Sequence, residues 1–242
     1  MKSMASLNPF GKEAKVPRIM VFASGEEGSE NGLLKLYEAT CTKPPALAAK
    51  ICALVTSRMH CPAAIDAKAL GIPLLFWEGP YDDDGYRQLF QRFSANFAML
   101  SGWLLPVNGL PPERTISIYR GPLPYFRGKG FYGKNLHTEV IEAYKRGEIR
   151  QTAMTMHFVT DAGQNGEDYG KGPVIFQYPI LIRKEDTPKS LAVRIGEVEG
   201  TWQAYILSLV VHGQISLKGN EVYHNCPHLA QFMPGKFISS RF

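Results

Sequence analysis

The chain has 242 residues, of which 45% are hydrophobic and 20% charged, and it carries a net charge of +5 with an isoelectric point of about 8.9. This length and apolar content are enough for a sizeable core, so we expect one main globular domain with short appendages. The Lys and Arg residues form no dense run, which argues against nucleic acid as a partner, and no apolar stretch approaches the length of a membrane span. The modest basic excess favours a small anionic ligand.

The cysteines indicate the cellular compartment. None of the four shows CxxC spacing: Cys41, Cys52, Cys61 and Cys226. With no signal peptide visible, we expect a reduced, cytoplasmic protein. His224 and His228 flank Cys226, but their spacing matches no standard zinc pattern, so we predict no metal site. Nothing in the sequence indicates the oligomeric state.

Residues 1–16 are polar and aperiodic, and we expect a flexible N-terminal arm there. Beyond them, apolar β-rich runs alternate with helical patterns. The expected strands are 18–23, 50–55, 71–76, 97–100, 115–119, 152–159 and 174–182. The expected helices are 33–39, 62–70, 84–93, 136–146 and a last one that runs to about 209. Asp186 or Thr187 is the expected N-cap of that last helix.

This alternation implies βαβ units and therefore an α/β fold, Rossmann-like, with a mainly parallel twisted sheet and helices on both faces. The last helix should pack Leu191, Ile195, Trp202 and Ile206 inward. We expect one domain over residues 17–215. Residues 216–242 should form a C-terminal tail or hairpin.

A glycine-rich loop, Ser-Gly-Glu-Glu-Gly-Ser-Glu-Asn-Gly, occupies residues 24–32 between the first strand and the first helix. Backbone N–H groups of such a loop, together with the helix N-terminus, bind anions such as a nucleotide phosphate. Glu26, Glu27 and Glu30 interrupt the motif and would repel a phosphate. The alternative is a glycine-rich turn without a ligand.

Three blocks in the second half of the chain carry a resemblance to a known family. They are Thr-Ile-Ser-Ile-Tyr-Arg-Gly-Pro-Leu-Pro (115–124), Gly-Lys-Gly-Phe-Tyr-Gly (128–133), and Met-His-Phe-Val-Thr-Asp (156–161) followed by Gly-Pro-Val-Ile (172–175). In this order they resemble the glycinamide ribonucleotide formyltransferase family over about residues 17–215. The resemblance implies a formyltransferase fold and a role in purine biosynthesis. It also implies formyl transfer from 10-formyltetrahydrofolate to the amine of glycinamide ribonucleotide.

The resemblance also implies site residues. The family's phosphate loop reads Ser-Gly-x-Gly-Ser-Asn, and Gly28, Ser29 and Asn31 are the matching substrate-binding positions. Near the other end of the chain, Glu199 matches the Glu of a Glu-His pair that contacts the nucleotide, and Gly200 takes the place of the His. The alternative for Glu199 is an ordinary exposed helix residue. A glycine inside a helix costs about 1 kcal/mol relative to alanine, so the helix should bend or close against a neighbour at Gly200.

At the catalytic positions the chain departs from the family. The family carries Asn and His on a strand written Asn-Ile-His-Pro and an Asp before the next Gly-Pro. The matching residues here are Ser117, Tyr119 and Gly170. Formyl transfer needs donors for a developing oxyanion and a base for the amine proton. Tyr119, with an intrinsic pKa of about 10, is neither a cation nor a base at neutral pH, so we expect slow turnover or none.

Other polar residues could compensate. Asp168 lies two residues before Gly170, and His157 and His137 match family histidines near the site. Each has an alternative interpretation. Asp168 is then a solvated loop carboxylate, His157 a half-buried strand residue satisfied by the backbone, and His137 a residue that caps or lines a helix.

Residues 99–107, Met-Leu-Ser-Gly-Trp-Leu-Leu-Pro-Val, resemble the family segment Leu-Ala-Gly-Phe-Met-Arg-Ile-Leu, which forms an apolar slot for the pterin. The implied cofactor-binding residues are Gly102, Trp103, Leu104 and Leu105. The alternative is that Trp103 and Leu104 are core residues at the end of a strand.

Three hypotheses for the function remain open. The protein is a formyltransferase with weakened chemistry, or a non-catalytic pseudoenzyme that retains a nucleotide or folate pocket. The third possibility is a different reaction in which Tyr119 donates a proton.

Overall fold

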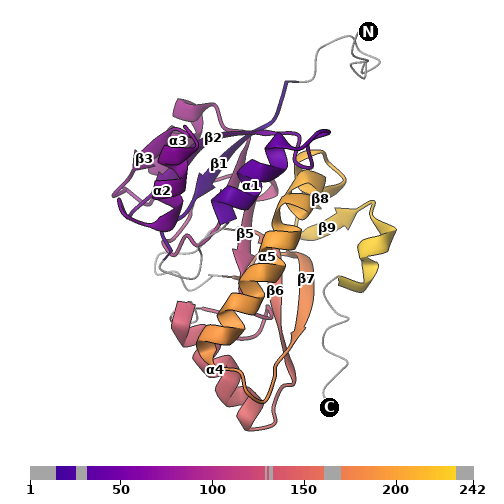
Figure 1. Ribbon diagram of the computed structural model, residues 1–242. Coiled ribbons are helices and arrows are strands. Elements are labelled where there is room, and N and C mark those ends of the chain that lie inside the picture. The colour runs from indigo at the N-terminus through magenta and orange to yellow at the C-terminus, as the bar shows by residue number, and fades with distance from the viewer. Residues whose placement is uncertain (1–14, 26–31, 129, 131–132, 161–169, 233–242) are drawn as a thin grey trace.

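A seven-stranded sheet dominates the computed structural model, which describes residues 15–25, 32–128, 130, 133–160 and 170–232. The strand order is β3-β2-β1-β4-β5-β6-β7 (Figure 1). The pairs from β3 across to β5 are parallel, and β6 and β7 join antiparallel at one edge. The predicted α/β fold with a mainly parallel sheet is confirmed.

The elements lie within a few residues of their predicted positions. The strands of the sheet are β1 (Arg18–Phe22), β2 (Lys50–Thr56), β3 (Leu74–Phe76), β4 (Phe97–Leu100), β5 (Thr115–Tyr119), β6 (Gln151–Phe158) and β7 (Val174–Leu181). The α-helices are α1 (Gly32–Cys41), α2 (Pro62–Ala69), α3 (Asp83–Phe93), α4 (Gly133–Lys145) and α5 (Pro188–Val211). A 3₁₀ turn, η1 (Pro112–Arg114), precedes β5.

Two boundaries have clear local causes. β3 begins at Leu74, not at Gly71, because Gly71 has φ +67° and the Ile72 N–H still bonds to the Ala67 carbonyl at the end of α2. At α5 the N-cap is Thr187. Its Oγ1 accepts from the Ser190 N–H at 3.1 Å, while the Ser190 Oγ accepts from the Thr187 N–H at 2.9 Å.

Alternate residues of each strand point to opposite faces of the sheet, and each face is covered by its own core. On β1, Ile19 and Val21 join the larger core, to which α1, α2, α4 and α5 contribute. Met20 and Phe22 join the smaller core, formed with α3 and the segment after β4. Figure 1 shows α5 crossing one face of the sheet, in contact with both α1 and α4.

The inner face of α5 is more polar than its sequence pattern suggests. Leu191, Ile195 and Ile206 are fully buried, as predicted, whereas Trp202 is only partly buried. Glu199 and Gln203, one helical turn apart, are 3% and 0% exposed. A carboxylate and an amide therefore lie within the interface between α5 and its neighbours.

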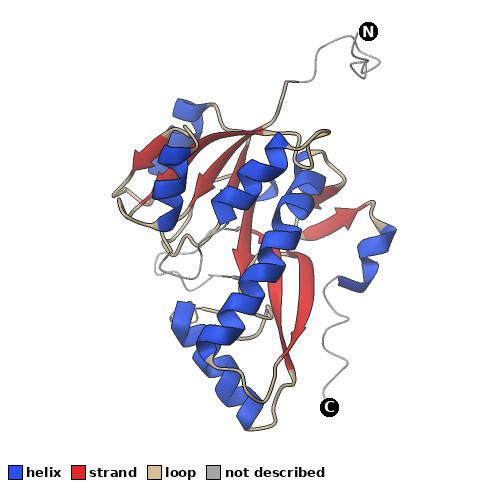
Figure 2. Cartoon of the chain, in the orientation of Figure 1, coloured by secondary structure: helices blue, strands red, loops and turns tan. Residues whose placement is uncertain are grey.

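The C-terminal segment forms a separate hairpin, β8 (Ile215–Lys218) and β9 (Glu221–His224), beside the main sheet (Figure 2). A short 3₁₀ helix, η2 (Pro227–Phe232), follows and packs against β7. Most of the predicted arm and the last ten residues of the predicted tail, 1–14 and 233–242, lie outside the described residues. No helix in the described part of the chain is long and apolar enough to cross a bilayer.

The strand order reverses direction between β1 and β4, because the chain passes from β1 toward β2 on one side and later enters β4 on the other. Ligands of open α/β sheets bind at the carboxyl ends of the strands at such a switch point. The two strand ends are tied together here. The Ser101 N–H bonds to the Phe22 carbonyl at 2.9 Å, and the Ser24 N–H bonds to the Gly102 carbonyl at 3.2 Å.

Candidate functional site

Gly32, Ser101, Arg120 and Glu199 meet at the switch point, and we call them the switch-point site. Gly32 is the first residue of α1, and its neighbours leave no room for a side chain. A Cβ built on it would stand 2.2 Å from the Ser101 Oγ and 3.5 Å from the Glu199 Oε1. The protein's own oxygen atoms therefore lie close to the positive end of α1. The predicted phosphate-binding residues Gly28, Ser29 and Asn31 lie outside the described residues.

Glu199 forms an ion pair with Arg120, the residue that follows β5. The distance from the Arg120 Nε to the Glu199 Oε2 is 2.8 Å, and the two side chains are 20% and 5% exposed. The interpretation of Glu199 as an exposed helix residue is therefore wrong, because α5 turns this carboxylate inward toward the switch point. Charge-assisted bonds of this kind are strong when largely desolvated.

His137 lies near this pair, on α4. It is 4% exposed, and its Nδ1 has no hydrogen-bond partner among the described residues. Burial, and after it the positive charge of Arg120, together lower its pKa from 6.5 to about 4. His137 is therefore a neutral, buried residue of a helix face at pH 7, which agrees with the alternative that it lines a helix.

A second group lies on one face of the paired strands β5 and β6, and we call it the strand-face group: Ser117, Tyr119 and His157. In the antiparallel pairing of β5 and β6, Ser117 stands opposite His157, and Tyr119 stands opposite Thr155. Residues directly opposite each other, and residues two apart on one strand, point to the same face. The structure thus brings together three residues that the sequence placed in one site.

Each hydroxyl of this group already has a local role. The Tyr119 hydroxyl donates to the Phe126 carbonyl, which holds the turn after β5. Among the described residues, the Ser117 Oγ reaches only the carbonyl of its neighbour Ile118, at 3.4 Å, a marginal hydrogen bond. Neither side chain is more than 7% exposed.

Two side chains from the antiparallel edge also hold that turn. The Thr155 Oγ1 donates to the Gly121 carbonyl at 2.7 Å, and the Gln177 Nε2 donates to the Leu123 carbonyl at 2.8 Å. The turn on which Tyr119 bonds is therefore fixed from β6 and β7 as well. Tyr119 is part of a structural network.

His157 is 4% exposed and bonds to the backbone, as the alternative interpretation foresaw, although it is fully buried and not half-buried. Its Nδ1 lies 2.8 Å from the Phe158 carbonyl, and since a carbonyl can only accept, Nδ1 carries the proton. Burial lowers its pKa and the bond to Phe158 opposes this in part, which leaves the pKa at about 4. At neutral pH it is uncharged and a weak base.

Gly170 adds no functional group, and its backbone has φ +76°, a region that favours glycine. A Cβ there would stand 3.1 Å from the Leu123 Cδ2. Asp168, the residue that could compensate, lies outside the described residues.

The predicted pterin segment divides into a buried and an accessible part. Trp103 is 1% exposed, its Nε1–H donates to the Tyr86 hydroxyl at 2.9 Å, and its ring packs against Phe22 and Trp77. In this arrangement Trp103 is a core residue with no free ring face for a pterin. Leu104, by contrast, is 38% exposed. Gly102 is adjacent to the buried Trp103, and Leu105 is partly buried against the smaller core.

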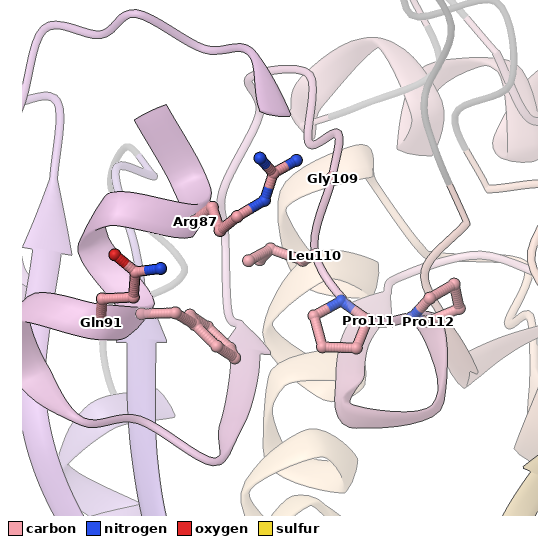
Figure 3. A pocket seen from close by; sticks show the side chains of 7 residues that line it. Arg87, Gln91, Gly109, Leu110, Pro111 and Pro112 are labelled. Atoms are coloured by element: carbon pink, nitrogen blue, oxygen red, sulfur yellow. The ribbon is translucent and has the colours of Figure 1, made fainter. Parts of the chain in front are cut away.

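A surface hollow of about 450 Å³ lies elsewhere, between α3 and the segment that leads into β5 (Figure 3). Its lining residues are Arg87, Phe90, Gln91, Gly109, Leu110, Pro111 and Pro112. Because the lining segment precedes β5, this hollow lies toward the amino ends of the parallel strands, away from the switch point. Arg87 is also engaged by Asp84 at 2.9 Å. In the described part of the chain, no three His, Cys, Asp or Glu residues are grouped to hold a metal ion.

Sequence comparison gives clear relatives, although no family model matches the chain. The chain is 29% identical over 203 residues to the phosphoribosylglycinamide formyltransferase, chloroplastic, of Arabidopsis thaliana, covering 79% of this chain and 64% of the relative. It is 30% identical over 188 residues to the protein of the same name from Vigna unguiculata, covering 74% and 55%. The chain is related to phosphoribosylglycinamide formyltransferases. It spans about 55–64% of the length of these two relatives.

The fold agrees with this relationship. Glycinamide ribonucleotide transformylase 1 from Symbiobacterium toebii matches with a TM-score of 0.70 and 21% identity, covering 88% of this chain and 95% of that one. The predicted formyltransferase fold is confirmed, and the chain shares it with phosphoribosylglycinamide formyltransferases.

Sequence reasoning missed two residues. Arg120 directly follows Tyr119 and occupies the position of the proline in the Asn-Ile-His-Pro strand of formyltransferases. A charged residue in place of that proline was the signal that could have identified Arg120 as a candidate site residue. Gln203 is wholly buried, and neither of its amide atoms has a partner among the described residues. The sequence shows that Gln203 lies one helical turn after Glu199 on α5, but it does not show that Gln203 is buried.

Proposed function

We propose that this protein is a phosphoribosylglycinamide formyltransferase-like protein of purine biosynthesis that is weak or inactive in formyl transfer. The reaction would move a formyl group from 10-formyltetrahydrofolate to the amine of glycinamide ribonucleotide, and the amine would lose a proton. Relatedness to phosphoribosylglycinamide formyltransferases and the shared fold support the substrate class. We further propose that the protein acts in the cytoplasm; the two plant relatives carry the word chloroplastic in their names.

The observation that carries the proposal of weak chemistry is the state of the strand-face group. The Tyr119 hydroxyl is bonded to a backbone carbonyl, the Ser117 Oγ makes a marginal hydrogen bond to another, and Gly170 has no side chain. His157 is a neighbouring group with a ring nitrogen, and its pKa of about 4 makes it a poor proton acceptor at neutral pH. Losing one preorganised donor typically costs about 10²–10³ in rate, so several changed positions should leave little turnover.

The co-substrate fits this chain in part. An apolar contact for a pterin is available at Leu104, whereas Trp103 is held in the smaller core. Folate binding would therefore involve Leu104 and the backbone around Gly102, without the indole ring. A non-catalytic protein that binds nucleotide or folate is the second candidate, and the ion pair at Glu199 is compatible with it.

The test is a formyl-transfer assay on the purified full chain with both substrates, with the Arabidopsis relative as positive control. We expect turnover at least 100-fold below the control, by the order of magnitude of a lost oxyanion donor. The variant Ser117→Asn/Tyr119→His/Gly170→Asp should raise that turnover. Aspartate tolerates positive φ better than most residues, so position 170 can accept it at modest strain.

A wild-type rate within tenfold of the control would refute the weak-enzyme proposal. Saturable binding of folate or nucleotide without turnover would favour the second candidate. If the triple variant folds and gains nothing, the changes extend beyond these three positions.

A further inference from the structure

The fold brings the charges of Arg120 and Glu199 together, because the residue after β5 meets a residue of α5 that lies 79 positions later in the chain. Glu199 is the more buried partner, with 5% of its side chain exposed. A carboxylate in such a place needs a positively charged or hydrogen-bonding partner. Arg120 supplies it through the 2.8 Å bond to Oε2.

Released from Arg120, Glu199 would be a ligand-binding group. Its other oxygen, Oε1, faces the start of α1, close to Gly32 and the Ser101 hydroxyl. A carboxylate accepts hydrogen bonds from neighbouring sugar hydroxyls, and backbone N–H groups at a helix N-terminus bind phosphate. A sugar phosphate with adjacent free hydroxyls matches both features.

We propose that Arg120 is a specificity-determining residue that competes with such a ligand for Glu199, so that a sugar phosphate binds only after the ion pair opens. The proposal rests on the proposed function in that it assigns a nucleotide-like ligand to the switch point. It goes beyond that function by making one residue of this chain an internal competitor. Inorganic phosphate has no sugar diol to engage Glu199, and arginine itself attracts phosphate, so its binding should not become tighter when Arg120 is removed.

The surroundings favour a closed pair in the free protein. His137 lies near Arg120 and is neutral at pH 7, so it adds no second positive charge that would weaken the bond between Arg120 and Glu199. Arg120 is the more exposed partner of the pair, with 20% of its side chain exposed against 5% for Glu199.

The experiment is calorimetric titration of the full chain with ribose 5-phosphate and, separately, with inorganic phosphate. Arg120→Ala should bind ribose 5-phosphate at least tenfold more tightly than the wild type, while inorganic phosphate should bind no more tightly than to the wild type. Arg120→Ala/Glu199→Gln should lose the gain. Arg114→Ala, which removes a 55% exposed arginine, is the matched control and should behave as wild type.

Ribose 5-phosphate affinity that is unchanged, weakened or unmeasurable in a folded Arg120→Ala protein overturns the proposal. An equal gain for inorganic phosphate does so as well, because the effect would then be general electrostatics. If Arg120→Ala does not fold, the Nε–H resonance of Arg120 in the wild type, assigned by its loss in Arg120→Lys, is followed by NMR. It should shift with saturating ribose 5-phosphate and not with phosphate, and its constancy overturns the proposal. Formyl transfer is measured in neither arm, so the two proposals can fail separately.

Discussion

The switch-point site and the strand-face group differ in how their buried polar side chains are paired. At the switch point the fold keeps two opposite charges in a largely buried place and pairs them with each other. On the strand face it keeps hydroxyls and an imidazole, all neutral, and satisfies them through backbone carbonyls. The difference is that an ion pair can be opened by a competing ligand, whereas Tyr119 and His157 are tied into the turn and the strand themselves.

The largest expected effect is a loss of stability in acid, to which a buried histidine in each region contributes. His157 and His137 both have folded-state pKa values of about 4, below the ordinary 6.5. The unfolded chain therefore binds more protons, and stability is lost as pH falls from about 6.5 through about 4. Each histidine contributes up to about 3 kcal/mol to this loss. Urea unfolding at pH 7 and pH 4.5 measures it.

Single substitutions show which histidine causes the loss of stability in acid. His157→Gln and His137→Gln should each flatten the pH dependence, whereas exposed His212→Gln should leave it unchanged. If neither buried substitution alters the slope, the two imidazoles do not titrate as described.

The next largest effect is the change in the free energy of unfolding when a glycine beside each region is replaced by alanine. A Cβ on Gly172 would stand 1.7 Å from the Phe158 carbonyl oxygen, so Gly172→Ala should lower the free energy of unfolding by about 3 kcal/mol. The matched control is Gly200→Ala on α5, where a Cβ would meet only the Lys35 Cγ at 3.6 Å. That substitution should stabilise by up to about 1 kcal/mol through helix propensity. Thermal unfolding of both variants gives the comparison, and equal effects would contradict it.

Breaking the ion pair should lower the free energy of unfolding by somewhat less than Gly172→Ala does. Arg120→Ala leaves the Glu199 carboxylate buried without its partner, and we expect a loss of about 2 kcal/mol. This is below the 3–5 kcal/mol typical of fully buried pairs, because Arg120 is partly solvated. In a double-mutant cycle, Arg120→Ala/Glu199→Gln should cost less than the sum of the single variants. Strict additivity would show that the two charges do not interact.

The smallest expected effect is a gain. Gln203 is 0% exposed and both its amide atoms lack partners among the described residues. Gln203→Met keeps the volume and removes the desolvated amide, so it should stabilise by about 1 kcal/mol. Chemical denaturation measures the gain, with Gln214→Met on the exposed surface as control. Destabilisation would mean that Gln203 has a polar partner beyond the described residues.

The elements of the fold could be predicted well because their signals are local. Alternation of strand and helix patterns gave the α/β class, and Thr187 and Gly71 show how a cap or a turn shifts a boundary by a few residues. The site could be predicted only in part. Ser117, Tyr119 and His157 do share a face, since register follows from pleat and pairing. The core position of Trp103 could not be read from the sequence alone, because an aromatic at a strand end suits a pocket and a core equally.

By itself, the sequence determined which segments form strands and helices, the relationship to formyltransferases, and which residue types stand at the catalytic positions. Only the tertiary structure decided what those residues do. Arg120 and Glu199 are 79 positions apart, and their 2.8 Å contact exists because α5 packs over the end of β5. Burial, hydrogen-bond partners and the pKa of a histidine depend on neighbours that are distant in the chain. Local patterns carry no information about such neighbours.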